Sequence, residues 1–186
     1  MSKYPIIFLN GTSSSGKTTI ARALQRLWHD PMLYASIDSF IFMFADHVLR
    51  DDEVRKRALW PLISAFNQSL PHIAETGFPV VIDYVMESRA WLDECLSSLA
   101  GYQVYFVGVM CPLDELERRE IARGDRQVGF ARWQHDRVHR YGPYDLEVDT
   151  HTHSPESCAE QLKELLLSKT VPQAFARLRK EKTAGQ

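Results

Sequence analysis

Eight consecutive residues near the start of the chain could bind phosphate groups. They match the pattern G-x-x-x-x-G-K-[ST] in full, directly after an apolar segment and at the start of an amphipathic one. Glycines let a backbone approach a ligand closely, and N–H groups at a helix N-terminus attract anions. Lysine offers a compact charge to the β- and γ-phosphates, and a hydroxyl suits Mg²⁺. A serine-rich turn that matches by chance is the alternative interpretation. The expected nucleotide-binding residues are Gly11, Thr12, Ser13, Ser14, Ser15, Gly16, Lys17, Thr18 and Thr19.

Two aspartates follow short apolar segments, Asp38 after residues 34–37 and Asp83 after residues 80–82. If both segments are parallel strands, the carboxylates lie at the edge of the sheet where ligands bind. Phosphoryl transfer to a hydroxyl benefits from one carboxylate that accepts the proton and from another that holds the metal. Asp38 suits the first role, although an N-cap for a following helix explains it equally well. Asp83, together with Thr18, suits the metal role.

Three arginines, Arg119, Arg123 and Arg126, lie in one short segment after the fourth apolar run. Guanidinium groups on a closing segment would stabilise the charge that spreads over a transferring phosphoryl group. Closure would also exclude water, which otherwise accepts the phosphoryl group. A solvated helix face explains the same spacing, because acidic residues alternate with the arginines. These acids are Glu115, Glu117 and Glu120.

Other polar and aromatic residues give weaker signals. His135 and His139 have the spacing of metal ligands on one helix, but no third ligand is evident, so a zinc site is not expected. His151 and His153 are expected to line a loop. The aromatic run at residues 40–44 could be core or could wall an apolar acceptor pocket.

The segments that must position these groups alternate between two kinds. Apolar runs rich in β-branched and aromatic residues predict strands at residues 5–9, 32–37, 79–83, 103–109 and 145–148. Helix-period segments lie between them, with N-caps at Ser88 and Ser154. Pro61 and Pro71 blur the limits of the second long helix, and the tail from about residue 180 is expected to be frayed. The pattern predicts one α/β domain over residues 1–186.

Composition excludes several classes of protein. The chain has 186 residues, of which 22 are basic and 24 acidic, so it lacks the basic excess of a generic nucleic-acid binder. No signal peptide and no membrane-spanning run of ~20 apolar residues is predicted. The three cysteines fit buried, reduced thiols. The expected location is the cytoplasm.

Several segments together resemble the chloramphenicol phosphotransferase-like family of P-loop kinases. They are Phe8-Leu9-Asn10-Gly11 with the loop serines, Ile37-Asp38-Ser39, Val81-Ile82-Asp83, Val107-Gly108-Val109, Arg119 to Arg126, and Tyr144 to Thr150. They are spread from about residue 4 to 165. The phosphate loop is common to many nucleotide-binding proteins, whereas the last two segments are more particular.

The resemblance implies a three-layer sandwich with a five-stranded parallel sheet in the order 2-3-1-4-5 and a helical lid at about residues 119–142. It implies ATP and Mg²⁺ as cofactors and transfer of the γ-phosphate to a hydroxyl of a small molecule, with antibiotic resistance as a role of the family. Lys17 and Thr18 match the nucleotide and metal positions, Asp38 the general base, and Arg119, Arg123 and Arg126 the lid arginines.

Two departures concern the acceptor. The antibiotic kinase has a second acid after the aspartate that matches Asp83, whereas Tyr84 follows here, and the segment after Asp38 is shorter and aromatic. The resemblance therefore supports the reaction more than the substrate. A nucleoside, nucleotide or metabolite kinase is one alternative. A nucleotide-binding regulatory protein without a small-molecule acceptor is another, and no motif that reads the base distinguishes ATP from GTP.

Overall fold

The computed structural model describes residues 4–49, 51–124 and 129–184. Its centre is a parallel five-stranded sheet in the order β2-β3-β1-β4-β5, which confirms the order that the sequence resemblance implied. The strands are β1 (Ile6–Asn10), β2 (Leu33–Ser36), β3 (Val80–Tyr84), β4 (Val104–Met110) and β5 (Leu146–Asp149). Each strand boundary differs from its predicted position by one residue, and β2 alone ends earlier than predicted because Ile37 already opens a helix.

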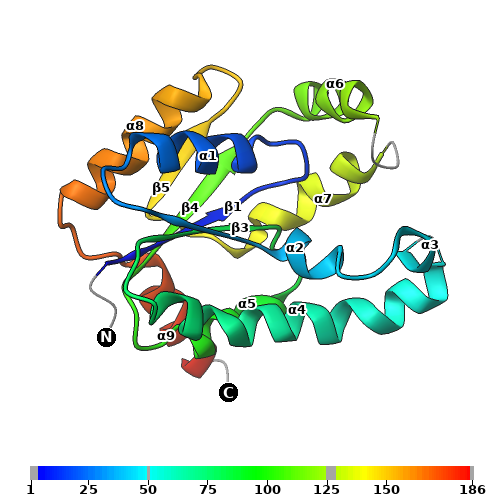
Figure 1. The fold of residues 1–186 in the computed structure, drawn as a ribbon, viewed down its shortest axis with the longest axis horizontal. Coiled ribbons are helices and arrows are strands. Elements are labelled where there is room, and N and C mark those ends of the chain that lie inside the picture. Colours follow the sequence, from blue (N-terminus) through cyan, green and yellow to red (C-terminus); the bar gives the residue numbers. More distant parts are fainter. Residues whose placement is uncertain (1–3, 50, 125–128, 185–186) are drawn as a thin grey trace.

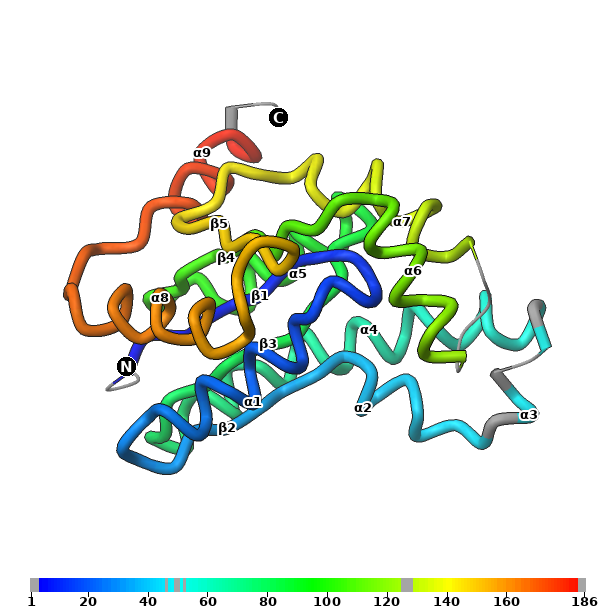
Figure 2. The backbone as a smooth tube through the Cα atoms, turned by 90° about the horizontal axis from the view of Figure 1, so that it is seen from above, coloured from blue at the N-terminus to red at the C-terminus, as the bar shows by residue number. Residues whose placement is uncertain are grey.

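Helices cover both faces of the sheet (Figure 1). One face carries α1 (Lys17–Leu27) and α8 (Pro155–Leu167), and the other carries α4 (Asp52–Ala74), α5 (Arg89–Ser98) and α9 (Ala174–Ala184). Beyond the carboxyl ends of the strands lie α2 (Ile37–Ile41), α3 (Asp46–Leu49), α6 (Leu113–Arg123), α7 (Phe130–Val138) and the 3₁₀ turn η1 (His139–Tyr141) (Figure 2). None of the helices in the described parts of the chain is both long and apolar enough to cross a membrane.

The central strand shows why the predicted strands are apolar throughout. Successive side chains of a strand point to opposite faces. Ile6 and Phe8 accordingly join the core under α4, α5 and α9, whereas Ile7 and Leu9 join the core under α1 and α8. Because both faces are covered, each position is buried, and a continuous apolar run replaces the alternation of a half-exposed strand.

Two helices differ from what the sequence predicted. Pro61 and Pro71 do not limit α4, which runs through both for 23 residues. The apolar stripe of Ile63, Phe66 and Leu70 is buried in the core, and this packing outweighs the hydrogen bonds that proline cannot donate. Where the sequence predicted a frayed tail from about residue 180, the structure has helix α9 as far as Ala184. The Arg179 guanidinium donates to carbonyls of α5 and its C-cap and holds α9 in place.

Both predicted N-caps are confirmed. The Ser88 hydroxyl accepts the N–H of Trp91 at 3.3 Å, and the Ser154 hydroxyl accepts the N–H of Ser157 at 3.1 Å. Each satisfies one N–H group that a helix start leaves without an intrahelical partner.

The buried side-chain amide of Asn10 joins the end of β1 to three other segments. Its Oδ1 accepts the N–H of Met86 at 2.9 Å, which fixes the orientation of the amide. Its Nδ2 then donates to the carbonyl of Val138 at 2.9 Å and to the hydroxyl of Tyr144 at 2.8 Å. The residue that leads into the phosphate loop is thus tied to the loop after β3, to the end of α7 and to the segment before β5.

The direction of these bonds determines the protonation of a histidine. Because Tyr144 accepts from Asn10, its own hydrogen points to Nδ1 of His139, 2.8 Å from the tyrosine oxygen. An acceptor Nδ1 requires the neutral ring. Burial, and to a lesser extent the charges of His135 and Lys17, lower the pKa of His139 to about 4.

This histidine predicts a loss of stability in mild acid. In the unfolded chain a histidine has a pKa of ~6.5, so between about pH 6.5 and pH 4 the unfolded state binds the proton and the folded state does not. The free energy of unfolding should therefore fall as the pH falls through this range, by up to about 3 kcal/mol. His139→Asn keeps an acceptor for Tyr144 but removes the titrating ring. The free energy of unfolding, measured with urea, should therefore depend less on pH between pH 7.5 and 4.5 in this variant than in the unaltered protein. An unchanged slope in that variant, or an equal flattening in the exposed-residue control His151→Asn, would contradict this account.

Candidate active site

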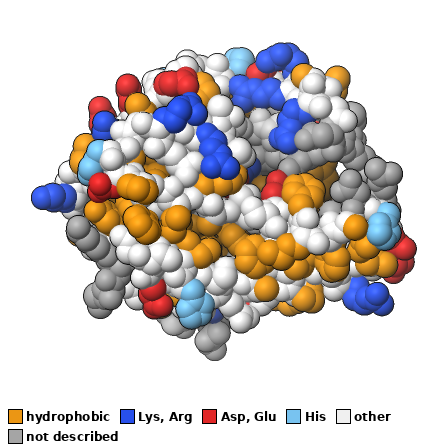
Figure 3. All heavy atoms as spheres, viewed as in Figure 1, with side chains coloured by type: hydrophobic (Ala, Val, Ile, Leu, Met, Phe, Trp, Pro, Cys, Tyr) orange, Lys and Arg blue, Asp and Glu red, His pale blue; other side chains and the backbone are white. Residues whose placement is uncertain are grey.

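A cleft of about 530 Å³ opens beyond the carboxyl ends of the strands. In Figure 3, basic side chains gather above this hollow and hydrophobic side chains border it below. Its walls come from the phosphate loop, the starts of α1 and α2, the end of β3, α6 and the loop after β5. The lining residues are Ser13, Ser14, Gly16, Lys17, Thr18, Thr19, Ile20, Ile37, Asp38, Asp83, Val85, Arg118, Arg119, Ala122, Arg123, Thr150, His153 and Pro155.

Glycine is required at both ends of the phosphate loop. A Cβ on Gly11 would lie 2.7 Å from the carbonyl oxygen of Val109 in β4 and 2.7 Å from the Ser15 hydroxyl, so only glycine lets the loop pass this close to the neighbouring strand. Gly16 has φ of 94°, in the left-handed region that favours glycine. The loop then turns directly into α1.

The start of α1 is suited to an anion. Its first N–H groups have no intrahelical partner, and within the described chain no side chain caps them. The hydroxyls of Ser14 and Ser15 are buried and, among the described residues, have no hydrogen-bond partner. Buried polar atoms of this kind are costly unless a ligand satisfies them. A phosphate group cradled by the loop would do so.

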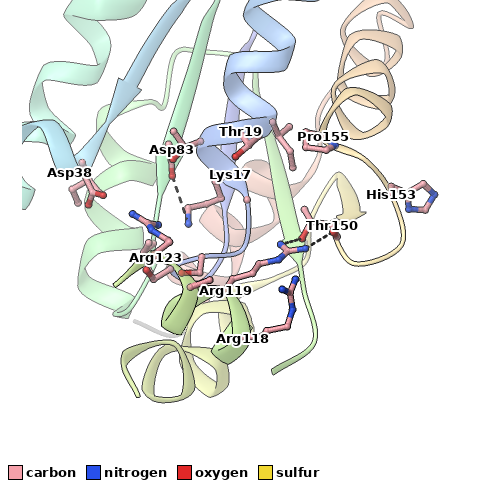
Figure 4. A pocket seen from close by; sticks show the side chains of 18 residues that line it. Lys17, Thr19, Asp38, Asp83, Arg118, Arg119, Arg123, Thr150, His153 and Pro155 are labelled. Atoms are coloured by element: carbon pink, nitrogen blue, oxygen red, sulfur yellow. Dashed lines mark hydrogen bonds and ion pairs between the residues drawn. The ribbon is translucent and has the colours of Figure 1, made fainter. Parts of the chain in front are cut away.

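Lys17 and Asp83 form the centre of the cleft (Figure 4). The Lys17 ammonium donates to the carbonyl of Thr12 at 2.8 Å and lies 3.8 Å from Oδ1 of Asp83. Oδ2 of Asp83 accepts from the hydroxyls of Thr18 at 2.7 Å and Tyr34 at 2.8 Å. Burial, and then the charge of Asp83, raise the pKa of Tyr34, so the phenol stays a donor. The predicted pair Thr18 and Asp83 is therefore brought together, with Tyr34 as an additional partner.

Asp38 lies on the wall of the same cleft and is not an N-cap. The hydroxyl of Ser36 caps α2 by accepting the N–H of Asp38 at 3.3 Å, which places Asp38 in the first turn. The capping interpretation is thus wrong for Asp38, because Ser36 takes that role. In Figure 4 its carboxylate lies across the cleft from Lys17, with Arg123 between them in this view.

The arginine-rich segment forms the wall opposite α2. Arg119 donates to the hydroxyl of Thr150 at 3.0 Å and to its carbonyl at 2.8 Å, and it also pairs with Glu115 at 2.6 Å. Hydrogen bonds from Arg118 and Arg119 lower the pKa of the Glu115 carboxyl to about 2. Arg119 and Arg123 both line the cleft, as predicted, and Arg118 joins them. Arg126 lies outside the described residues.

Glu120, expected as an alternative surface charge, is instead buried at the junction of α6 and α7. Its carboxylate accepts the N–H groups of Gly129 at 2.7 Å and Ala131 at 2.8 Å. It caps the start of α7 from the neighbouring helix and fixes the angle between the two. The acidic residues of α6 are therefore not all solvated.

The histidines and aromatic residues that gave weaker sequence signals lie in different surroundings: some are packed in the core, and others line the cleft or are exposed. The ring of His139 faces Tyr144, and His153 lines the cleft. The aromatic run divides, since Phe40 packs on Phe66 in the core, with ring centroids 5.2 Å apart, whereas Phe42 and Met43 are 60% and 67% exposed. Tyr84, at the position of the second acid of the antibiotic kinase, is buried against Phe8 and does not line the cleft.

Sequence reasoning missed several residues of the site. Tyr34 was assigned only to a strand, yet its hydroxyl donates to the carboxylate of Asp83. Gln134 was not singled out, yet its side chain bonds the N–H of Ser13 in the phosphate loop at 2.7 Å. No motif marks either residue. Each makes its contact with a residue far away in sequence, and the spacing of nearby residues does not predict such contacts. Thr150 could have been found from the sequence, because it ends the segment from Tyr144 to Thr150, one of the more specific parts of the family resemblance.

Comparison with known proteins agrees with this geometry. The profile of the family described as chloramphenicol phosphotransferase-like protein matches residues 5–167. Two Mycobacterium tuberculosis proteins, from strains CDC 1551 and H37Rv, are 32% identical over 94% of this chain and 88% of their own length, and both are provisionally described as O-phosphotransferases. The chain therefore belongs to the chloramphenicol phosphotransferase-like family.

Solved structures show the same fold. The Mycobacterium tuberculosis APS kinase CysC, in complex with AMPPNP and APS, has a TM-score of 0.68 at 18% identity, over 89% of this chain and 99% of its own. Shikimate kinase from Acinetobacter baumannii, in complex with shikimate, has a TM-score of 0.68 at 15% identity, over 91% of this chain and 96% of its own. The fold is that of P-loop kinases.

The close approach at Gly11 predicts a specific sensitivity. Gly11→Ala should lower the free energy of unfolding by about 1–3 kcal/mol, because the added methyl group meets the backbone of β4 and the loop must shift. Gly101→Ala is the matched control, since a Cβ there meets nothing within 4 Å and φ is not positive. Urea unfolding of both variants measures the difference. Equal stability of the two variants would show that the loop has room at Gly11.

Proposed function

We propose that this family member is an ATP-dependent O-phosphotransferase that moves the γ-phosphate to a hydroxyl of a small molecule. The observation that carries the proposal is the meeting of the phosphate loop, Lys17, Asp83 and Asp38 in one cleft. A nucleotide-binding protein without an acceptor has no need of a carboxylate opposite the lysine. The fold of the kinases named above supports the nucleotide, and the position of Asp38 supports the acceptor.

The phosphate loop would hold the β- and γ-phosphates of ATP. The N–H groups at the start of α1 and the hydroxyls of Ser14 and Ser15 supply donors, and Lys17 supplies charge. Thr12 and Asp83 hold the ammonium group of Lys17 at the loop. Such preorganisation avoids a cost of rearrangement when charge develops.

The oxygens of Thr18 and Asp83 fit Mg²⁺. They lie 2.7 Å apart at the edge of the cleft, and hydroxyl and carboxylate oxygens are the ligands that Mg²⁺ prefers. When bound, the ion would neutralise charge on the β- and γ-phosphates. The oxygen of Thr18 can offer a lone pair to the ion while its hydrogen is still donated to Asp83, and Tyr34 keeps its own bond to the same carboxylate.

Asp38 would act as the general base. Its carboxylate accepts the proton of the acceptor hydroxyl as the oxygen forms a bond to the γ-phosphorus. The bond between that phosphorus and the β–γ bridging oxygen breaks, and ADP leaves. Arg119 and Arg123 line the opposite wall, where they can stabilise charge on the transferring group.

The acceptor would enter on the side of α2. Asp38 lies there beside Ile37 and Val85, and the exposed Phe42 and Met43 continue the same short helix and its C-terminal turn. Within the cleft, the carboxylate of Asp38 is thus accompanied by the apolar side chains of Ile37 and Val85, which favours a hydroxylated molecule with an apolar part.

Replacing the base should separate chemistry from nucleotide binding. Asp38→Asn should reduce phosphoryl transfer ~10²–10⁴-fold, the usual effect of a positioned base, with ATP affinity nearly unchanged. The protein is incubated with ATP, Mg²⁺ and a mixture of hydroxylated antibiotics and metabolites that includes chloramphenicol. Mass spectrometry then identifies any compound that gains one phosphoryl group.

Asp136→Asn, at an exposed carboxylate of α7, is the matched control and should retain full transfer. A product that forms equally with Asp38→Asn would exclude the general base. If no phosphorylated product forms, and the unaltered protein and Asp38→Asn hydrolyse ATP equally slowly, the nucleotide-binding regulatory alternative is favoured. A phosphorylated nucleoside or nucleotide would favour the other kinase alternative.

Replacing the lysine tests the phosphate loop itself. Lys17→Ala should reduce transfer by ~10²–10³-fold, the cost of removing a preorganised donor to a developing charge. The fold should survive, because Asp83 keeps its hydrogen bonds from Thr18 and Tyr34. Circular dichroism and urea unfolding monitor the fold, and Lys56→Ala, at an exposed lysine of α4, is the control. Unaltered transfer in Lys17→Ala would exclude the assignment of the phosphate loop.

A further inference from the structure

A glutamine of the lid reaches the phosphate loop from outside the cleft. Gln134 lies on the inner face of α7 and is buried. Its Oε1 accepts the N–H of Ser13 at 2.7 Å, and its Nε2 donates to Oε1 of Glu87 at 2.5 Å. One side-chain amide thus connects α7, the phosphate loop and the segment between β3 and α5.

Glu87 determines which way this amide faces. An ionised carboxylate only accepts hydrogen bonds, so it requires the NH₂ group of Gln134, and Oε1 is left facing the loop. In the reverse orientation the NH₂ group of Gln134 would face the N–H of Ser13, so that two donors meet. The amide oxygen of Gln134 would then face the carboxylate of Glu87, so that two acceptors meet. Burial raises the pKa of Glu87, whereas the hydrogen bond from Gln134 and then the charge of Arg137 on α7 act in the opposite direction and favour the ionised form.

The loop needs such a hold at this point. The residue after Ser13 is Ser14, which has φ of 63°, a left-handed conformation that residues other than glycine rarely adopt. Conformations of this kind persist where surrounding contacts over-determine them. Within the described loop, Gly11 and Lys17 fix the two ends, and Gln134 fixes the backbone just before the strained residue.

We infer that Gln134 is a positioning residue of the phosphate loop and that Glu87 orients it. The pair holds the Thr12–Ser13 peptide, which leads into Ser14, in the conformation that receives the terminal phosphate, so nucleotide affinity depends on a donor–acceptor match between α7 and the loop. The inference rests on the proposed function for its ligand, whereas the contact itself can be measured without nucleotide.

The experiment inverts the polarity of the pair. Gln134→Glu places a second carboxylate against Glu87, and two carboxylates in contact share a proton and titrate at raised pH. At pH 6.0 the shared proton restores a donor to Glu87. At pH 8.5 both groups are ionised and repel, and the loop loses its hold. Affinity for AMPPNP with Mg²⁺, measured by calorimetry, should then equal that of the unaltered protein at pH 6.0 and be about tenfold weaker at pH 8.5, or ~1.4 kcal/mol.

The swapped variant E87Q/Q134E is the rescue. Its amide at position 87 donates to the carboxylate at position 134, which still accepts from Ser13, so affinity at pH 8.5 should return to within about twofold of the unaltered protein. Gln68→Glu is the matched control, because the same change is made beside a carboxylate, Glu94 at 3.5 Å, on α4 away from the cleft. It should leave affinity unchanged at both pH values.

The second readout is hydrogen exchange of the Ser13 amide in nucleotide-free protein, followed by NMR. Exchange should be slow in the unaltered protein, fast in Gln134→Glu at pH 8.5 relative to the control, and slow again in the swapped variant. An affinity ratio that does not change with pH, or a swapped variant no better than Gln134→Glu, overturns the positioning role. If the unaltered protein does not bind AMPPNP, the proposed function and the role in nucleotide binding both fall, while the exchange rates still decide whether the contact exists.

Discussion

The buried amide of Asn10 is the interaction on which the site depends. It ends the central strand and begins the phosphate loop, and its hydrogen bonds go to Met86, Val138 and Tyr144. These partners belong to segments that are distant in sequence, yet each carries or adjoins part of the cleft. The N–H of Met86 donates to the amide oxygen of Asn10, so the NH₂ group of Asn10 must face Tyr144. The hydroxyl of Tyr144 accepts from that group, and its own hydrogen therefore points to His139. Loss of one member leaves a buried polar group without a partner, which costs about 1–3 kcal/mol.

A second constraint is the shape of the phosphate loop. The loop contains a serine in a left-handed conformation and two buried hydroxyls that, within the described residues, have no partner. Each such feature costs of order 1–3 kcal/mol on its own. The loop keeps its shape because β4 lies against Gly11 and α7 reaches Ser13 through Gln134. A phosphate ligand would accept hydrogen bonds from the hydroxyls of Ser14 and Ser15, so binding would offset the cost of burying them.

The sequence predicted the fold, and it singled out residues that the structure brings into one cleft, for a physical reason. The strands are apolar because both faces are covered, and the phosphate loop is a contiguous motif whose residue types follow from its geometry. Lys17, Thr18 and Asp38 lie in segments that follow strands, and Asp83 lies in the last part of β3; the parallel topology brings these strand ends together. Tyr34, Glu87 and Gln134 were out of reach, because their roles arise from contacts across 47 to 121 positions of sequence. The same holds for α9, whose polar sequence gives no sign of the hydrogen bonds that Arg179 donates to the carbonyls of Leu96 and Leu99.

The parts of the cleft differ in how firmly the fold holds them, and this bears on specificity. The phosphate loop, Asp83 and Arg119 are fixed by the sheet, by buried hydrogen bonds or by Thr150. Asp38 is also fixed, through the cap that Ser36 provides. Beyond it α2 is short, and Phe42 and Met43 are exposed at and just after its C-terminal end. Substitution there disturbs little of the core, so the acceptor can change while the phosphoryl-transfer groups stay in place. Under the proposed function, the choice of acceptor would therefore lie in the segment that follows Asp38.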